Sequence, residues 1–327
     1  MTAQNENRTM YYGKGDVFVY RTFVQPLTGL RKIPESSFTE RDNTIFGFNC
    51  QISLKGEAFL SSFTEGDNSL VVATDSMKNI IHRQAANYQG NTAEGFLKFI
   101  CEVFLDKYSH IDAVELTATE VPFDHVLVPK GEGHENSDVV YRCSRNERAT
   151  TTIEVKRTPT GSKIVKHSSG IVDVQLIKVK GSSFYGFIQD EYTTLPEAQD
   201  RPLFIYLDFD WEYSRWEDGT GADPEKYVAA EQICDIANTV FHELNNRSIQ
   251  QLIYHIGIRI LERFPQLANV QFKTNNRTWE TVVETIPNSE GSVYQEPRPP
   301  FGFQGFVVTQ EDVKQKKAAD STVGASR

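Results

Sequence analysis

Two acidic side chains could hold a cation in one strand-like segment of the chain. Asp208 and Asp210 flank Phe209, and side chains two residues apart in a strand point to the same face. Carboxylate oxygens are the ligands that Ca²⁺ and Mg²⁺ prefer in proteins. A solvated strand face explains the same pattern more simply, so we predict no metal site here.

The histidines and glycines also lack the spacing of common catalytic motifs. The seven histidines are scattered, and those on predicted helices (His82, His242 and His255) are expected to be structural. The residues after His242 do not supply the second histidine of a zinc-binding helix. Gly13-Lys14-Gly15 lacks the spacing of a phosphate loop, and no Gly-x-Gly-x-x-Gly run opens a helix after a strand. Zinc-helix, P-loop and dinucleotide chemistries are therefore set aside.

The charge balance limits the partners of the chain. Its 327 residues carry a net charge of −10, and no stretch gathers Lys and Arg into a basic face. This composition argues against nucleic acid or an anionic membrane as the partner. An anionic ligand would have to be held by a few local cations.

The cysteines and the ends of the chain predict a cytoplasmic protein. The four cysteines are far apart and form no Cys-x-x-Cys pair, which is typical of reduced thiols. The segment Met1–Thr9 is polar and lacks the apolar core of a signal peptide. No apolar run approaches the roughly 20 residues of a membrane span, so we expect no membrane association.

Four segments have apolar residues at helical spacing. One opens with Asp223-Pro224, an N-cap followed by proline at the first helical position. Another opens with Ser248 and Gln251, the spacing of a capping box, and must end before Pro265. The four predicted helices cover Thr74 to Tyr88, Thr92 to Tyr108, Asp223 to Leu244, and Ser248 to Phe264.

Strand-like segments flank each pair of helices and reveal a structural repeat. They are Asp16–Phe23, Phe46–Leu54, Val114–Pro122, Glu147–Lys156, Ile171–Val179, Leu203–Trp211, Val270–Phe272 and Gly305–Thr309. The order of two strands, two helices and two strands occurs twice, which predicts a duplicated α+β unit. The turn Thr158–Gly161 is the natural boundary. We therefore predict units at residues 1–158 and 159–311, and a flexible, Lys-, Ala- and Ser-rich tail at 312–327.

Four motifs in a fixed order resemble one known family. The longest runs from Leu176 to Pro202 and contains Ser183–Phe187, Asp190–Leu195 and Asp200–Pro202. The others are Val71–Asn79, Tyr12–Lys14, and Ser248–Gln250 with Asn276 further on. Together they resemble the urate oxidase (uricase) family, and in particular its bacterial, Bacillus-type members, over nearly the whole chain.

The resemblance implies a fold and an assembly. Family members have the tunnelling fold (T-fold), in which two tandem units build an antiparallel sheet with helices on its outer face. Subunits close these sheets into an oligomeric barrel, and the homotetramer has its active sites where two subunits meet. The repeat of α+β units is compatible with that architecture.

The resemblance also implies a cofactor-free reaction in purine catabolism, with urate and dioxygen as substrates and 5-hydroxyisourate and hydrogen peroxide as products. Lys14 and Thr74 would form a catalytic dyad that helps to deprotonate urate. Arg201 would present its planar fork to one purine edge, and the amide of Gln250 would meet the opposite edge. The other implied roles are an aromatic platform (Phe184), a backbone contact (Ile249), anion-binding N–H groups (Thr74 and Asp75) and a dioxygen contact (Asn276).

One position departs from the family pattern. Many members carry a histidine two residues after the asparagine, but this chain has Thr278 there. A hydroxyl can pass a proton through water but cannot act as a charged acid near neutral pH. Thr278 is therefore a possible relay residue, and a urate-binding protein without turnover is one alternative. A zinc-dependent pterin enzyme of the same fold is another.

Each site residue also has a simpler interpretation. Phe184 could be a core aromatic residue, and Arg201 could form a surface ion pair with Glu191 or Asp190. Gln250 and Thr74 could serve only as helix caps, and Lys14 could be a solvated loop residue.

Overall fold

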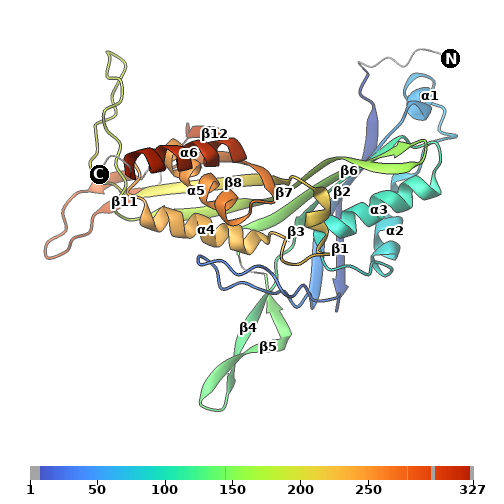
Figure 1. The fold of residues 1–327 in the computed structure, drawn as a ribbon, viewed down its shortest axis with the longest axis horizontal. Helices are drawn as coiled ribbons and strands as arrows, with labels where there is room; N and C mark the ends of the chain where they lie inside the picture. Colours follow the sequence, from blue (N-terminus) through green and yellow to red (C-terminus); the bar gives the residue numbers. More distant parts are fainter. Residues whose placement is uncertain (1–7, 144, 278, 296–298, 325–327) are drawn as a thin grey trace. The chain divides into compact units, whose positions relative to one another are not determined.

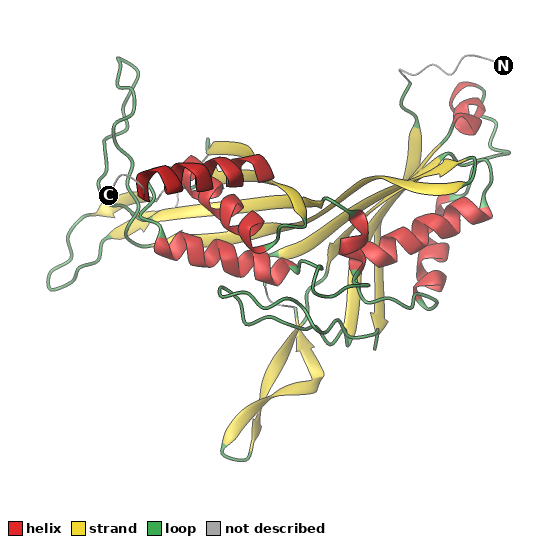
Figure 2. Cartoon of the chain, viewed as in Figure 1, coloured by secondary structure: helices red, strands yellow, loops and turns green. Residues whose placement is uncertain are grey.

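The computed structural model describes residues 8–143, 145–277, 279–295 and 299–324. Contacts divide the chain into two compact units. The first comprises Met1–Arg31, Thr39–Ser169 and Arg215–Tyr227, and the second comprises Lys32–Phe38, Gly170–Ser214 and Val228–Arg327. In each unit the helices cover one face of antiparallel strands (Figures 1 and 2).

In the first unit the strands are in the order β1-β2-β3-β6-β7. These strands are β1 (Tyr11–Thr22), β2 (Ile45–Lys55), β3 (Ala113–Glu120), β6 (Arg148–Thr158) and β7 (Gly161–Lys178). The unit also contains η1 (Glu57–Phe59), α1 (Leu60–Thr64), α2 (Thr74–Ala85), α3 (Ala93–Lys107), the hairpin of β4 (Asp124–Lys130) and β5 (Gly133–Arg142), and η2 (Trp216–Thr220).

In the second unit the order is β7-β8-β9-β12. These strands are β7, β8 (Leu203–Tyr213), β9 (Leu267–Asn276) and β12 (Gly302–Thr309). The other elements are α4 (Ala230–Glu243), α5 (Ile249–Arg263), α6 (Gln310–Gly324) and the short pair β10 (Glu280–Val283) and β11 (Val293–Gln295).

Local signals in the sequence explain the best-defined helices. The Thr92 side chain accepts a hydrogen bond from the N–H of Gly95 and caps α3. Phe96, Ile100 and Phe104 follow at helical spacing and are buried in the core of the first unit. The predicted helix from Thr92 to Tyr108 is therefore confirmed.

Strand β8 shows the corresponding pattern for a strand. Alternate residues from Leu203 to Tyr213 are buried, because one face of the strand packs into the core. Phe209 and Trp211 are fully buried on this face, together with Phe272 of β9. Asp208 and Asp210 lie on the opposite, half-buried face.

The predicted start of one helix is wrong, and the C-terminal tail contains a helix that the sequence did not predict. The helix expected from Asp223 begins only at Ala230, because residues 223–227 form a turn and the N–H of Val228 donates to the Tyr213 hydroxyl. The tail expected to be flexible from Asp312 is helical as far as Gly324. Asp312 accepts hydrogen bonds from the N–H and hydroxyl of Thr309. These bonds cap the start of this helix.

The unit boundary and one hairpin also differ from the sequence pattern. The turn at Thr158–Gly161 joins β6 to β7, but contacts assign residues up to Ser169 to the first unit, since β7 pairs with β6. The β4–β5 hairpin was not predicted.

Within the described ranges, each helix is too short or too polar to span a bilayer.

Candidate functional site

A pocket of about 250 Å³ lies in the second unit, beside the start of α5. Five of the residues predicted for the site line it: Phe184, Arg201, Ile249, Gln250 and Asn276. The remaining lining residues are Ser182, Ser183, Leu195, Leu203, Asn246, Ser248 and Gln304. The structure therefore gathers one part of the predicted site from four separate stretches of sequence.

Arg201 supplies a partly buried positive charge to this pocket. Its backbone N–H donates to the carbonyl of Ser182 at 2.8 Å, and its guanidinium carbon lies 5.3 Å from the ring centre of Phe184. Burial lowers the pKa of Arg201. Its Nε atom is buried without a hydrogen-bond partner, and among the described residues it forms no ion pair. The alternative of a surface ion pair with Glu191 or Asp190 is therefore wrong.

Phe184 presents an aromatic ring at the same pocket. Two backbone hydrogen bonds with Ala198, of 2.8 and 2.9 Å, hold its main chain. Its ring stacks on Phe187, with centres 4.8 Å apart and planes 14° apart. Because the side chain is only partly buried, it is a wall of the pocket and not a core residue.

The first turn of α5 directs polar groups at the pocket. Ser248 Oγ accepts from the N–H of Gln251 at 3.1 Å, and Gln251 Oε1 accepts from the N–H of Arg247 at 2.9 Å. The cap is thus made by Ser248 and Gln251, which leaves the exposed side chain of Gln250 for a ligand. The N–H groups of Ile249 and Gln250 have no acceptor within the helix, so they are donors available to an anion.

Asn276 is the last residue of β9 and pairs with Ile205 of β8 and Gly302 of β12. Its Oδ1 atom accepts a hydrogen bond of 3.2 Å from Gln304 Nε2. A Cβ atom at position 302 would lie 2.8 Å from that oxygen, so a larger residue there would displace the Asn276 amide. Gln304 is not among the residues predicted for the site, because only the strand register brings it beside Asn276.

Asn246 is a second residue that sequence reasoning missed. It is 1% exposed, and its Nδ2 group donates to Ser182 Oγ at 3.2 Å. Its backbone carbonyl accepts from the N–H of Ser183 at 3.0 Å. These bonds tie the loop before α5 to the segment that carries Phe184. An asparagine just after the end of a predicted helix is the local signal that could have indicated this role.

Lys178, within the long sequence motif, supports the same loop. Its Nζ donates to the carbonyls of Phe241 at 2.9 Å and Leu244 at 2.7 Å. These carbonyls lie at the C-terminus of α4, where the last groups of a helix lack internal partners. Lys178 therefore holds the end of α4 immediately before Asn246.

The other predicted site residues, Lys14, Thr74 and Asp75, lie in the first unit. The Tyr12 hydroxyl accepts from the N–H of Val72 at 2.8 Å, which joins β1 to the segment before α2. A Cβ at Gly13 would lie 1.8 Å from the carbonyl oxygen of Ile52, so only glycine allows this approach. Lys14 is exposed on β1, and is not a loop residue.

Thr74 and Asp75 are the first two residues of α2, and the N-cap is Ala73. Thr74 is therefore not the cap, and both residues have N–H groups without helical acceptors. Asp75 bonds to Lys78 at 2.9 Å and to Asn79 at 2.8 Å. The hydrogen bond from Lys78 lowers the pKa of Asp75, and the charge of Lys14 contributes in the same direction. In the described part of the chain, Lys14 and Thr74 do not hydrogen-bond to each other.

The carboxylate pair on β8 has a structural explanation. Asp208 Oδ1 accepts from the N–H of Asp173 at 2.8 Å. Burial raises the pKa of Asp210, and the charge of Lys273 opposes that shift. Among the described residues, no group of three or more His, Cys, Asp or Glu side chains could hold a metal ion.

Thr278, the predicted relay residue, lies outside the described residues.

Comparison with known proteins places the chain among close relatives. A family model described as Uricase matches residues 10–153 and 167–304. The uric acid degradation bifunctional protein PucL of Bacillus subtilis (strain 168) is 55% identical over 310 residues, which cover 95% of this chain. The chain spans 63% of the length of that relative. A uricase of Haloferax volcanii is 51% identical over 309 residues, covering 94% of this chain and 100% of its own.

A solved structure has the same fold. The crystal structure of a uricase from Bacillus fastidious superposes with a TM-score of 0.93 and is 62% identical. The match covers 95% of this chain and 97% of that one.

Proposed function

This chain belongs to the uricase family, and from that premise we propose that it is a urate oxidase that oxidises urate with dioxygen. The pocket that collects Phe184, Arg201, Gln250 and Asn276 supports this proposal most directly. A planar anion of purine size needs an aromatic wall, a cation without a competing carboxylate, and donors at its edges. The pocket contains all three.

Each lining residue then has a role in binding. The guanidinium of Arg201 donates two parallel hydrogen bonds to one edge of the purine. The amide of Gln250 offers a donor and an acceptor side by side to the opposite edge, next to the backbone of Ile249. Phe184 stacks on the ring face. The buried Nε of Arg201 would gain a partner when such a ligand binds.

The reaction consumes urate, dioxygen and water and yields 5-hydroxyisourate and hydrogen peroxide. Urate loses two electrons and two protons, dioxygen gains them, and water adds to the oxidised ring. An electron-rich urate dianion can reduce dioxygen without a cofactor. Lys14 and Thr74 help to deprotonate urate, the N–H groups of Thr74 and Asp75 receive its five-membered ring, and Asn276 holds dioxygen.

The assembly proposed with this function is a homotetramer of T-fold subunits whose sheets close into a barrel. Each site takes Lys14, Thr74 and Asp75 from one chain and Phe184, Arg201, Gln250 and Asn276 from its neighbour. Lys14 is exposed, and Arg201 has no carboxylate partner among the described residues. Both features suit a site that is completed when subunits associate. We place the enzyme in the cytoplasm, without nucleic acid or membrane partners.

The test is the loss of urate absorbance in air, with hydrogen peroxide measured alongside. Stoichiometric peroxide release, unchanged after dialysis against a strong chelator, is the expected result. Urate binding without peroxide would indicate a binding protein disabled at Thr278. Activity that disappears on dialysis and returns with zinc, copper or iron would contradict cofactor independence.

A further inference from the structure

Three polar side chains of the second unit form a chain of hydrogen bonds that leads to Asn276. Thr274 and Asn276 are on β9, and Gln304 is on the neighbouring strand β12. The register pairs Gln304 with Thr274, and Gly302 with Asn276. Residues two apart on a strand share a face, so these side chains can contact one another across the two strands.

The hydrogen bonds that link Thr274, Gln304 and Asn276 have a defined direction. The hydroxyl of Thr274 donates to Gln304 Oε1 at 2.9 Å, which turns the amino group of Gln304 toward Asn276. Gln304 Nε2 then donates to Asn276 Oδ1 at 3.2 Å. Asn276 therefore uses its carbonyl oxygen toward Gln304, and the groups that its amide can offer to a ligand are N–H donors.

Thr274 sets this direction from outside the pocket. It is 5% exposed, whereas Gln304 and Asn276 both line the pocket. The oxygen and amino ends of an amide have nearly the same shape, so packing alone does not select one orientation. The hydroxyl of Thr274 has one other acceptor, the backbone carbonyl of Gln304, which lies farther away at 3.4 Å. Its proton therefore favours the orientation that presents Oε1 at 2.9 Å.

We propose that Gln304, oriented by Thr274, is a positioning residue that holds the amide of Asn276 as a hydrogen-bond donor to the reacting oxygen. This inference rests on the proposed oxidation of urate by dioxygen. Negative charge develops on dioxygen as it accepts electrons, and pre-oriented N–H donors stabilise such charge. A carbonyl oxygen in the same place would repel it.

Thr274→Val tests the proposal, since valine keeps the shape of threonine and removes the donor. We expect kcat/KM for dioxygen to fall about tenfold, less than the ~100-fold or greater loss typical of deleting such a donor outright. The affinity for azaxanthine, an inhibitor purine that takes no electrons, should change by less than about twofold. Thr274→Ser keeps a hydroxyl and should restore most of the rate.

Gln304→Met independently tests the middle residue of the hydrogen-bond chain from Thr274 to Asn276. It should lower kcat/KM for dioxygen by at least as much as Thr274→Val does, and adding Thr274→Val to it should cause no further loss. Gln271→Met is the matched control, because Gln271 is an exposed residue of the same strand β9 outside the pocket lining. It should behave like the parent protein.

Several outcomes would overturn the inference while urate oxidation stands. In the first, the parent oxidises urate and the Thr274→Val variant has the same kcat/KM for dioxygen as the parent. Another is equal loss of turnover and azaxanthine binding, which would indicate a general structural role. If the parent itself releases no peroxide from urate, the proposed function fails, and the inference fails with it.

Discussion

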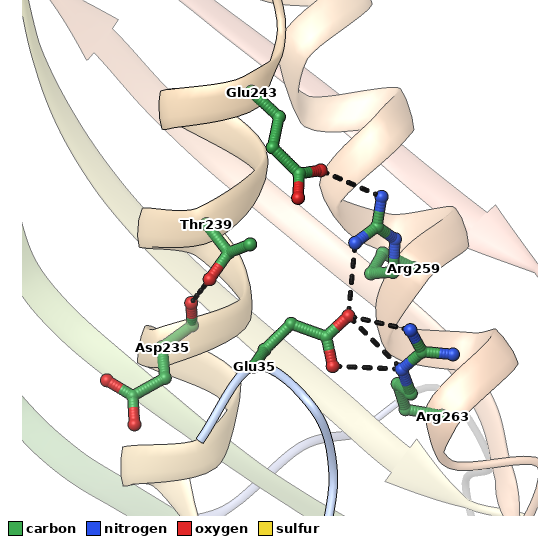
Figure 3. A network of polar contacts seen from close by, with 6 residues as sticks. All are labelled: Glu35, Asp235, Thr239, Glu243, Arg259 and Arg263. Carbon is green, nitrogen blue, oxygen red and sulfur yellow. Dashed lines mark hydrogen bonds and ion pairs between the residues drawn. The ribbon is translucent and has the colours of Figure 1, made fainter. Parts of the chain in front are cut away.

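Glu35 and Arg263 form a bidentate ion pair in the second unit (Figure 3). Arg263 Nε donates to Glu35 Oε2 at 2.9 Å, and Arg263 Nη2 donates to Oε1 at 2.8 Å. Arg263 Nε also lies within hydrogen-bond distance of Oε1, at 3.1 Å, and Arg259 Nη1 donates to Oε1 at 3.0 Å. The Glu35 side chain is 3% exposed, so the pair attaches the segment Lys32–Phe38 firmly to α5.

We expect Glu35→Gln to destabilise the protein in a pH-dependent way. Burial raises the pKa of Glu35, but hydrogen bonds from Arg263 and Arg259 outweigh it and leave the pKa below its ordinary value. The carboxylate therefore stabilises the fold above the pKa of the unfolded chain, and this stabilisation is lost as pH falls through the folded pKa. Near neutral pH the free energy of unfolding should drop by about 2 kcal/mol. Melting curves of parent and variant should converge in acid, and a pH-independent difference would contradict this account.

Lys178→Met should lower the free energy of unfolding by about 1–2 kcal/mol, because two carbonyls at the end of α4 lose a charged donor. Methionine keeps an apolar stem of similar length, so the effect reports the ammonium group. Lys180→Met, at an exposed position nearby, is the control and should leave the melting temperature unchanged. Equal melting temperatures for the Lys178 variant and the parent would show that this cap contributes nothing.

Arg201→Lys should weaken binding of azaxanthine by roughly 2–4 kcal/mol, because lysine keeps the charge but loses the planar fork. Isothermal titration measures the loss directly. Arg247→Lys is the control, since Arg247 is exposed and outside the pocket lining. If both variants bind the inhibitor as tightly as the parent does, Arg201 is not the residue that recognises the purine edge.

Complementation between two inactive variants tests whether the site is shared between chains. Thr74→Ala and Arg201→Ala should each be nearly inactive alone. In a two-fold interface a mixed pair has one doubly damaged site and one intact site, so random co-expression should restore roughly a quarter of parental activity. A site built within one chain cannot be rescued in this way. Mixed tetramers seen by mass spectrometry without recovered activity would exclude the shared site.

Local signals carried most of the fold prediction. The Ser248 cap and Pro265 correctly bounded α5, because capping and proline effects depend on residues next to each other in the chain. The helix predicted from Asp223-Pro224 begins only at Ala230, because the N–H of Val228 donates to the Tyr213 hydroxyl instead. A partner distant in sequence therefore overrode the local helix signal.

The sequence by itself determined the family, and it predicted the repeat of α+β units and the site residues Phe184, Arg201 and Asn276. Side-chain type and motif order specify these without reference to the fold. Only the tertiary structure decided which residues meet. It shows that Arg201 has no carboxylate partner among the described residues, and that Gln304 donates a hydrogen bond to Asn276. Such partners are set by strand register and by the course of loops, which bring together residues far apart in sequence.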